Sequence, residues 1–396
     1  MKRRQFLQQS ALASSMVFVP NFIKATEQLS PSTLNTKKLV IIQLSGGNDG
    51  LNTVVPYTND IYYKKRPKIA IKPTEVIKLN DTMGLHHNMK SLQKIYDKGY
   101  LGILNNVGYP NPNRSHFRST DIWHTASQSN EYLTSGWVGR YMEHLGGKPY
   151  TALEIADSLS LMLKGGSTNG IATTNAKLLN RNMNTPYFKK ILQHQTDAHL
   201  SEHNLGYLYK TMIASKSSAK YIYEKSKTAP STKTYPNNPF GKQLKTTAGF
   251  INSRLDTKVY YLSMGGFDTH ANQNMAQSRL LQLYAEGMEV FVKDLEDNGT
   301  FDDVLIMTFS EFGRRVRENA SKGTDHGAAN NVFIIGKNLK KTGFYNEGPD
   351  LNNLDANKDL KYSIDFRSIY TSLLQNWLGV EAKPILNSTF TPLDFI

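Results

Sequence analysis

Runs of apolar residues alternate with amphipathic segments along the chain. Residues 38–44 form a nearly continuous apolar run that ends at Ser45-Gly46-Gly47, which is typical of a central strand buried on both faces. A later segment places residues at helical spacing on one apolar face, namely Leu281, Tyr284, Met288, Phe291 and Leu295. Strands that alternate with helices predict an α/β protein with a mostly parallel central sheet and helices on both faces.

The same pattern predicts the other elements of this sheet. We expect further strands over residues 100–107, 151–156, 258–264, 303–309 and 331–335. Helices are expected over residues 87–98 and 365–378, and the second of these ends at Gly379. Residues 201–241 are rich in Lys, Ser, Tyr and Asn, which predicts a surface helix followed by a loop.

The first 25 residues have the pattern of an export signal. Arg3-Arg4 precedes a weakly apolar stretch, and Ala25 is a plausible cleavage point. Paired arginines in this position are typical of a twin-arginine signal. We therefore expect the domain at residues 38–379 to be carried, folded, to the periplasm or cell envelope by the twin-arginine machinery. No later apolar run approaches the roughly 18 residues of a transmembrane helix.

Composition narrows the range of partners. The formal net charge of +14 favours anionic partners such as phosphate or sulfate esters, acidic glycans or a lipid surface. The lysines are scattered, and no basic helix or aromatic–basic motif appears, which argues against nucleic acid. The sequence contains no cysteine, so disulfides and thiolate metal ligands are excluded.

Residues suited to catalysis follow the ends of predicted strands, where open α/β sheets place their sites. Asp49, in a glycine-rich loop, can bind a hard metal ion or can simply cap a helix. Ser115 lies near a predicted helix start, where it can serve as a nucleophile or only as the helix cap. Beside it, Arg114, His116 and Arg118 supply positive charge for an anionic substrate.

Two later loops add candidate metal ligands. Asp268 and His270 follow the strand at 258–264 and can face one metal ion. The alternative is a hydrogen-bonded turn, but Gly265-Gly266 directly upstream suggests close backbone packing and slightly favours a site. Glu311 ends another strand and is costly if buried without a partner. His326 lies just before residues 331–335. The expected ligands of a divalent ion (Zn, Mn, Ca or Mg) are Asp49, Asp268, His270, Glu311 and His326.

Several motifs together resemble a bacterial family of unknown function that is typically exported by the twin-arginine route and belongs to the alkaline phosphatase and sulfatase clan. These motifs lie at residues 46–50, 108–117, 266–270, 310–314, 325–326 and 365–367, and the resemblance covers residues 38–379. It implies an alkaline phosphatase-like fold. It also implies that Asp49 is the acid after the first strand, that Ser115 is the nucleophile, and that Asp268, His270 and His326 bind metal.

The leading functional expectation is an exported metal-dependent hydrolase of phosphate or related esters. Ser115 would attack, and Arg114 or Arg118 would hold the anionic substrate. The alternative is a catalytically inactive exported binding protein on the same fold, with envelope glycans as ligands. Ser310-Glu311, which stands where the clan usually has an Asp-His pair, favours this alternative. A transferase such as a phosphoethanolamine transferase is a third possibility, whereas no sulfatase modification signal follows Ser115.

Overall fold

The structure is a computed structural model that describes residues 36–193 and 203–396. Lys37–Ile396 forms one compact unit. The expected export signal at residues 1–25 lies outside the described residues. Within the described part of the chain, no helix combines the length and the apolar character that crossing a bilayer requires.

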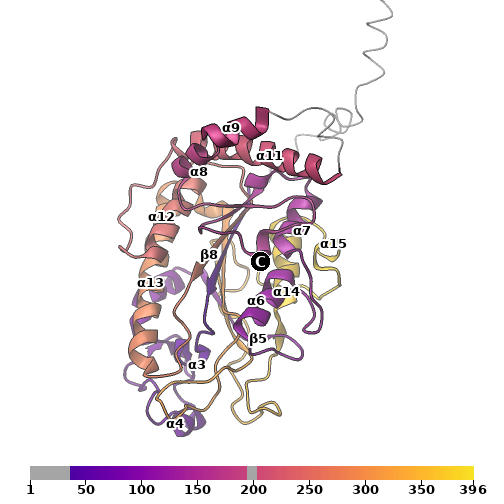
Figure 1. Cartoon of the computed structure of the whole chain (residues 1–396). Coiled ribbons are helices and arrows are strands. Elements are labelled where there is room, and N and C mark those ends of the chain that lie inside the picture. Colours follow the sequence, from indigo (N-terminus) through magenta and orange to yellow (C-terminus); the bar gives the residue numbers. More distant parts are fainter. Residues whose placement is uncertain (1–35, 194–202) are drawn as a thin grey trace, which may run out of the picture. The chain divides into compact units, whose positions relative to one another are not determined.

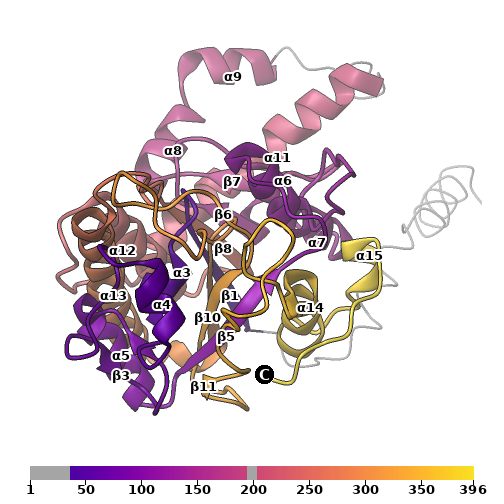
Figure 2. The same cartoon turned by 90° about the horizontal axis from the view of Figure 1, so that it is seen from below.

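A nine-stranded sheet forms the centre of the fold (Figures 1 and 2). Its order is β11-β5-β10-β9-β1-β8-β6-β7, and β12 also pairs with β5. All of β1 is buried between two neighbouring strands, as its apolar run predicts. The strand bounds are β1 Lys38–Leu44, β5 Leu101–Gly108, β6 Ala152–Glu154, β7 Ile171–Ala172, β8 Val259–Met264, β9 Val304–Phe309, β10 Asn330–Ile335, β11 Gly343–Phe344 and β12 Ile364–Asp365.

Strand β10 runs opposite to both of its neighbours, β5 and β9. The other strand pairs described in this sheet are parallel. Asn330, the first residue of β10, pairs with Val107 near the end of β5. The amino end of β10 therefore lies level with the carboxyl end of β5. The predicted mostly parallel sheet is confirmed, with this one reversal.

Helices cover both faces of the sheet, as predicted (Figure 2). Val40 and Ile42 of β1 share an apolar cluster with residues of α5 Lys90–Asp97, α12 Pro239–Asn252 and α13 Gln273–Asp297. Leu39 and Ile41 point the other way, because successive strand side chains alternate between the faces. They share a second cluster with residues of α6 His116–Thr125, α7 Trp137–His144, α14 Phe366–Ser372 and α15 Lys383–Leu386.

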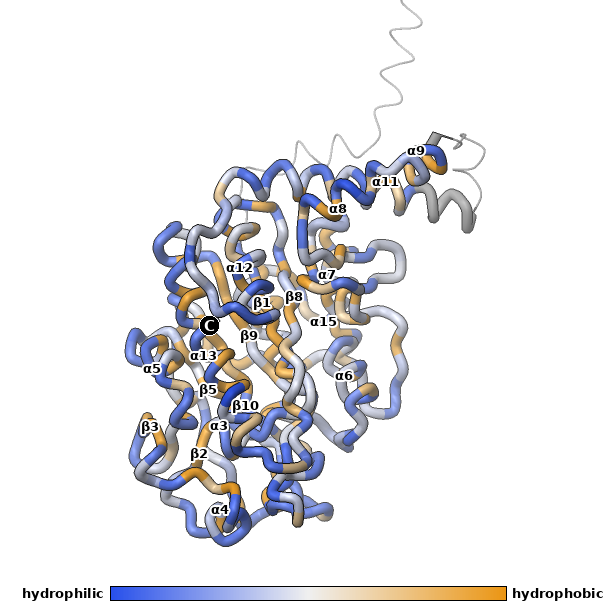
Figure 3. Tube along the Cα trace, turned by 60° about the vertical axis from the view of Figure 1, so that its left-hand side comes forward, coloured by the Kyte–Doolittle hydropathy of each residue, from blue (hydrophilic) through white to orange (hydrophobic). Residues whose placement is uncertain are grey.

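Shorter elements surround this core. A three-stranded sheet, β2-β4-β3, follows β1. Its strands are β2 Val54–Val55, β3 Ile77–Lys78 and β4 Gly84–Leu85, and helices α3 Gly50–Thr53 and α4 Asp60–Lys65 lie in the same stretch of chain. The predicted helix at 87–98 consists of a 3₁₀ turn, His87–Met89, followed by α5. Figure 3 shows that apolar residues concentrate along the central strands and the helices that cover them.

The segment expected as a surface helix and loop contains α11 His203–Ser226, and a loop joins it to α12. Two more helices precede it, α8 Ala176–Asn182 and α9 Pro186–Gln193. The last predicted helix begins as α14 and continues as a π-helix, Leu373–Trp377. Gly379 follows at φ 72°, the left-handed conformation in which glycine commonly ends a helix.

Candidate active site

The loops that carry the predicted site residues meet at one edge of the sheet. The segments after β5, β8 and β9 leave this edge because parallel strands end on the same side. His326 precedes β10, and in a wholly parallel sheet it would lie at the opposite edge. Because β10 is reversed, its amino end lies at the same edge, and His326 joins the other site residues.

Four side chains converge there and form what we call the histidine cluster: His116, Asp268, His270 and His326. The Nε2 atoms of the three histidines lie 3.5, 3.0 and 3.3 Å from Oδ1 of Asp268, in the order His116, His270 and His326. The Nε2 atoms of His270 and His326 are 2.9 Å apart. Ligand atoms of His116, Asp268 and His326 all lie within 4.8 Å of one another, close enough to hold one metal ion.

Each histidine of the cluster is held through its other ring nitrogen. Nδ1 of His116 lies 2.8 Å from Oε1 of Glu311. Nδ1 of His326 lies 2.7 Å from the carbonyl oxygen of Arg114, and Nδ1 of His270 lies 3.5 Å from Oδ1 of Asp325. Histidines that bind metals commonly have an acceptor behind them in this way, because it fixes the ring and leaves Nε2 free.

The cluster fits a metal ion by a further observation. Nε2 of His116 is buried and has no hydrogen-bond partner among the described residues. A buried polar atom without a partner is costly, and such atoms are rare in proteins. A metal ion bound beside Asp268 would supply the missing interaction.

Phe312 packs against two rings of the cluster. Its ring centroid lies 4.8 Å from that of His116 and 4.7 Å from that of His326. Gly47 makes this position possible, since a Cβ at residue 47 would lie 2.3 Å from Cε2 of Phe312. Gly47 also has φ +69°, which strains any other residue. Gly47 therefore leaves room for the ring of Phe312 beside the histidine cluster.

Arg314 sets the charge of the cluster. Its buried guanidinium donates to Oδ1 of Asp268 at 2.7 Å and to the carbonyl oxygens of Gly47 and Thr324 at 2.6 and 2.8 Å. Partial burial of Asp268 opposes ionisation, but the hydrogen bond and charge of Arg314 outweigh it and lower the pKa of Asp268 to about 2. The carboxylate is therefore ionised at neutral pH.

The pKa values of two neighbouring histidines shift in opposite directions. The hydrogen bond that His116 donates to the Glu311 carboxylate raises the pKa of His116, against the effect of its burial. Burial lowers the pKa of His326, although the carbonyl of Arg114 and the carboxylate of Asp268 oppose this. Groups with shifted pKa values that lie together are typical of functional sites.

Glu311 was predicted to bind metal directly, but the structure places its carboxylate behind His116. The side chain is buried, and Oε1 accepts hydrogen bonds from the Gly46 N–H at 2.8 Å and from His116. Oε2 lies 3.3 Å from Nε2 of Gln43. Hydrogen bonds from the Gly46 N–H and from His116 thus offset the free-energy cost of burying the Glu311 carboxylate. Glu311 in turn orients the ring of His116.

Asp49 does not reach the cluster, so its predicted role as a metal ligand is not supported. Its side chain is fully buried, and Oδ2 accepts hydrogen bonds from Arg66 at 2.6 Å and Gln273 at 2.5 Å. Oδ1 accepts from the N–H of Leu51 and caps α3. The structure agrees with the simpler alternative, in which Asp49 is a helix cap.

The predicted nucleophile and substrate-binding residues lie around the start of α6. Ser115 is the exposed N-cap of this helix, and its hydroxyl makes no capping hydrogen bond. His116 belongs to the cluster instead of acting only as a substrate contact. Arg114 is paired with the buried Asp359. Arg118 donates to the carbonyls of residues 128 and 129, each at 3.1 Å, so its guanidinium holds a loop rather than facing the cluster.

The fold and the site define an α/β protein with a cluster of histidines and aspartate where its strands end. The chain belongs to the family described as protein of unknown function (DUF1501), whose model matches residues 36–387. A comparison with curated protein sequences finds no match.

Solved structures with a similar fold include members of the alkaline phosphatase superfamily. Lipoteichoic acid synthase LtaP from Listeria monocytogenes has a TM-score of 0.42 and 11% identity over 90% of this chain and 76% of that chain. A protein in the alkaline phosphatase superfamily from Vibrio parahaemolyticus has a TM-score of 0.38 and 10% identity over 92% and 75%. The PsFucS1 sulfatase from Pseudoalteromonas sp. has a TM-score of 0.38 and 11% identity over 90% and 70%. These similarities concern the fold alone.

Proposed function

We propose that this protein is a metal-dependent hydrolase of phosphate or related esters, with its metal held by the histidine cluster. The observation that carries the proposal is the convergence of three Nε2 atoms on Oδ1 of Asp268. The ligand atoms of His116, Asp268 and His326 are close enough to share one ion, and imidazole ligands suit Zn better than Ca, Mg or Mn, which prefer oxygen ligands. A divalent ion at such a site polarises the ester and lowers the pKa of water.

Residues of this chain would do the remaining work. Glu311 and Asp325 hold the rings of His116 and His270. Ser115 lies next to His116 at the start of the ten-residue helix α6, where the helix dipole favours a negatively charged nucleophile or substrate. We therefore keep Ser115 as the proposed nucleophile. Arg114, whose side chain is 30% exposed, is the proposed contact to the anionic ester.

A catalytically inactive binding protein is the second candidate, and Arg314 favours it. Its guanidinium already supplies a positive charge 2.7 Å from Oδ1 of Asp268, and its Nη1 lies 3.5 Å from Nε2 of His270. A cation fixed inside the cluster reduces the attraction of Asp268 for a metal ion. In this case the cluster would bind an anionic ligand, such as an envelope glycan, without metal.

Metal content and turnover, measured on protein exported by its native route, separate the two candidates. We expect about one Zn per chain in the wild type by elemental mass spectrometry, and none in an Asp268→Asn/His270→Ala variant. Hydrolysis of p-nitrophenyl phosphate should be lost in Ser115→Ala while the metal is retained. Absence of metal from folded wild-type protein would support the binding protein. Full turnover by Ser115→Ala would remove Ser115 from the mechanism.

A further inference from the structure

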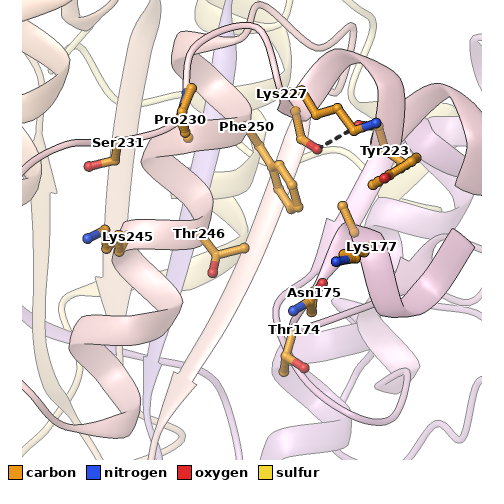
Figure 4. A pocket seen from close by; sticks show the side chains of 13 residues that line it. Thr174, Asn175, Lys177, Tyr223, Lys227, Pro230, Ser231, Lys245, Thr246 and Phe250 are labelled. Atoms are coloured by element: carbon orange, nitrogen blue, oxygen red, sulfur yellow. Dashed lines mark hydrogen bonds between the residues drawn. The ribbon is translucent and has the colours of Figure 1, made fainter. Parts of the chain in front are cut away.

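A second potential binding site lies away from the histidine cluster, between helices α8, α11 and α12 (Figure 4). It is an open hollow of about 600 Å³, and a smaller hollow of about 280 Å³ shares Asn175 and Lys177 with it. We call the two together the basic groove. No residue of the histidine cluster lines it.

The charged side chains among the described residues that line the basic groove are all positive. Lys177, Lys227 and Lys245 line the larger hollow, and Arg181 lines the smaller one. No aspartate or glutamate is among the described residues that line either hollow. Exposed lysines elsewhere in the fold often pair with carboxylates, as Lys94 does with Glu289. A groove lined by four cations, with no acidic residue among its described lining residues, attracts an anion strongly.

The rest of the lining matches a sugar. Pro230 gives apolar surface for the C–H face of a pyranose ring, and Tyr223 adds an aromatic ring whose centroid lies 3.6 Å from the ammonium of Lys227. Hydroxyl and amide groups of Thr174, Asn175, Ser231 and Thr246 can bond to sugar hydroxyls. The two hollows are adjacent, since they share Asn175 and Lys177, so a ligand of more than one sugar unit can contact both.

A membrane surface fits this site less well. These cations are exposed, but they line the walls of two hollows, which a sugar chain can enter and a flat bilayer cannot. Of the large apolar side chains of the lining, Phe250 is only 3% exposed and Leu178 is 41% exposed, so the groove offers a single such side chain to lipid. We infer that the basic groove binds an acidic oligosaccharide, whose carboxylate or sulfate groups pair with Lys177, Lys227, Lys245 and Arg181. This site is independent of the proposed hydrolase chemistry.

Binding of defined sugars to the full chain tests the inference. The probes are a galacturonate decasaccharide, a sulfated carrageenan decasaccharide and a neutral agarose decasaccharide, titrated calorimetrically at 20 and 300 mM NaCl. We expect one or both acidic sugars to bind, with an affinity that falls steeply with salt as screening increases. The neutral sugar should bind at least about tenfold more weakly, because it lacks the charged groups that the cations pair with. Equal affinity for the neutral sugar, or no binding of any sugar, would overturn the inference.

Two double variants that remove the same charge, one in the basic groove and one outside it, test whether the sugar binds in the groove. Lys177→Gln/Lys245→Gln should weaken binding about tenfold or more. Lys64→Gln/Lys90→Gln removes the same charge from exposed positions on α4 and α5 and should change affinity less than about twofold. Equal losses in both would mean that only net charge matters, against a built site. Binding to phosphatidylglycerol vesicles without binding to sugars would assign the lysines to a membrane. The Asp268→Asn/His270→Ala variant should bind the acidic sugar normally, so failure of the hydrolase proposal leaves this test valid.

Discussion

The Nε2 atoms of His270 and His326 lie 2.9 Å apart, although 56 residues separate them in the chain. The carbonyl of Arg114 can only accept a hydrogen bond, so Nδ1 of His326 carries its proton. Burial holds the pKa of His326 below its usual value, which favours a neutral ring with a lone pair on Nε2. That lone pair is available to bind a metal ion.

Replacing Glu311 with glutamine should weaken metal binding by about 10- to 100-fold, the usual cost of losing the acceptor behind a metal-binding histidine. The amide keeps the shape but removes the charge that raises the pKa of His116. Competition with a chelating dye measures the affinity. Glu286→Gln, on the exposed part of α13, is the control. An unchanged affinity would show that His116 does not bind the metal.

Replacing Arg66 with methionine should destabilise the fold by about 3–5 kcal/mol, because it leaves the buried carboxylate of Asp49 without its charged partner. Urea unfolding measures the change, with the exposed Arg317→Met as control. Metal content should stay as in the wild type. If the variant keeps its stability but loses metal, Asp49 belongs to the metal site after all.

His124 should make the fold less stable in mild acid. It is buried on α6, with Nε2 2.9 Å from the hydroxyl of Tyr261, and burial lowers its pKa to about 3. In the unfolded chain its pKa is about 6.5. Between these values the unfolded chain binds more protons, so stability falls as pH drops below about 6.5, by about 2 kcal/mol at about pH 5.

His124→Gln should remove this contribution, so the difference in unfolding free energy between about pH 7 and pH 5 should shrink by about 2 kcal/mol. Urea titrations of both proteins at the two pH values give the comparison. An identical pH dependence would mean that His124 takes up its proton in the folded state.

Export by the twin-arginine route, which we infer from the first 25 residues, has its own test. Arg3→Lys/Arg4→Lys should leave the protein in the cytoplasm, since the route reads the paired arginines. Cell fractionation and immunoblotting detect the change. Lys24→Gln, in the same segment, should be exported normally. Equal export of both variants would rule out the twin-arginine signal.

The main strands could be predicted from sequence because most of their residues are buried and apolar. The predicted bounds of β1 match those of the structure, and β8, β9 and β10 begin within one residue of prediction. The short strands such as β7 and β12 were missed, since two residues carry no periodicity. Their pairing is decided by the neighbouring strands.

The site was predicted less completely, for reasons that depend on tertiary structure. Asp268, His270 and His326 do come together, but the reversal of β10 that brings in His326 cannot be read from its apolar pattern. Asp49 was predicted to bind a metal ion because the sequence does not show its ion pair with Arg66. Arg66 lies in a segment to which the hydrophobic pattern assigns no helix or strand. His116 was recognised as part of the site, yet only the position of Glu311 shows which of its nitrogens faces the cluster.

The reversed strand also affects the kinetics of folding. It brings His326 to the carbonyl of Arg114, 212 residues earlier in the chain, and contacts between such distant residues are slow to form. An ion held by the histidine cluster would therefore bind only after most of the sheet has assembled. Interactions absent from the transition state slow unfolding without speeding folding. Metal loading would thus lengthen the lifetime of the folded protein in denaturant while leaving its refolding rate unchanged.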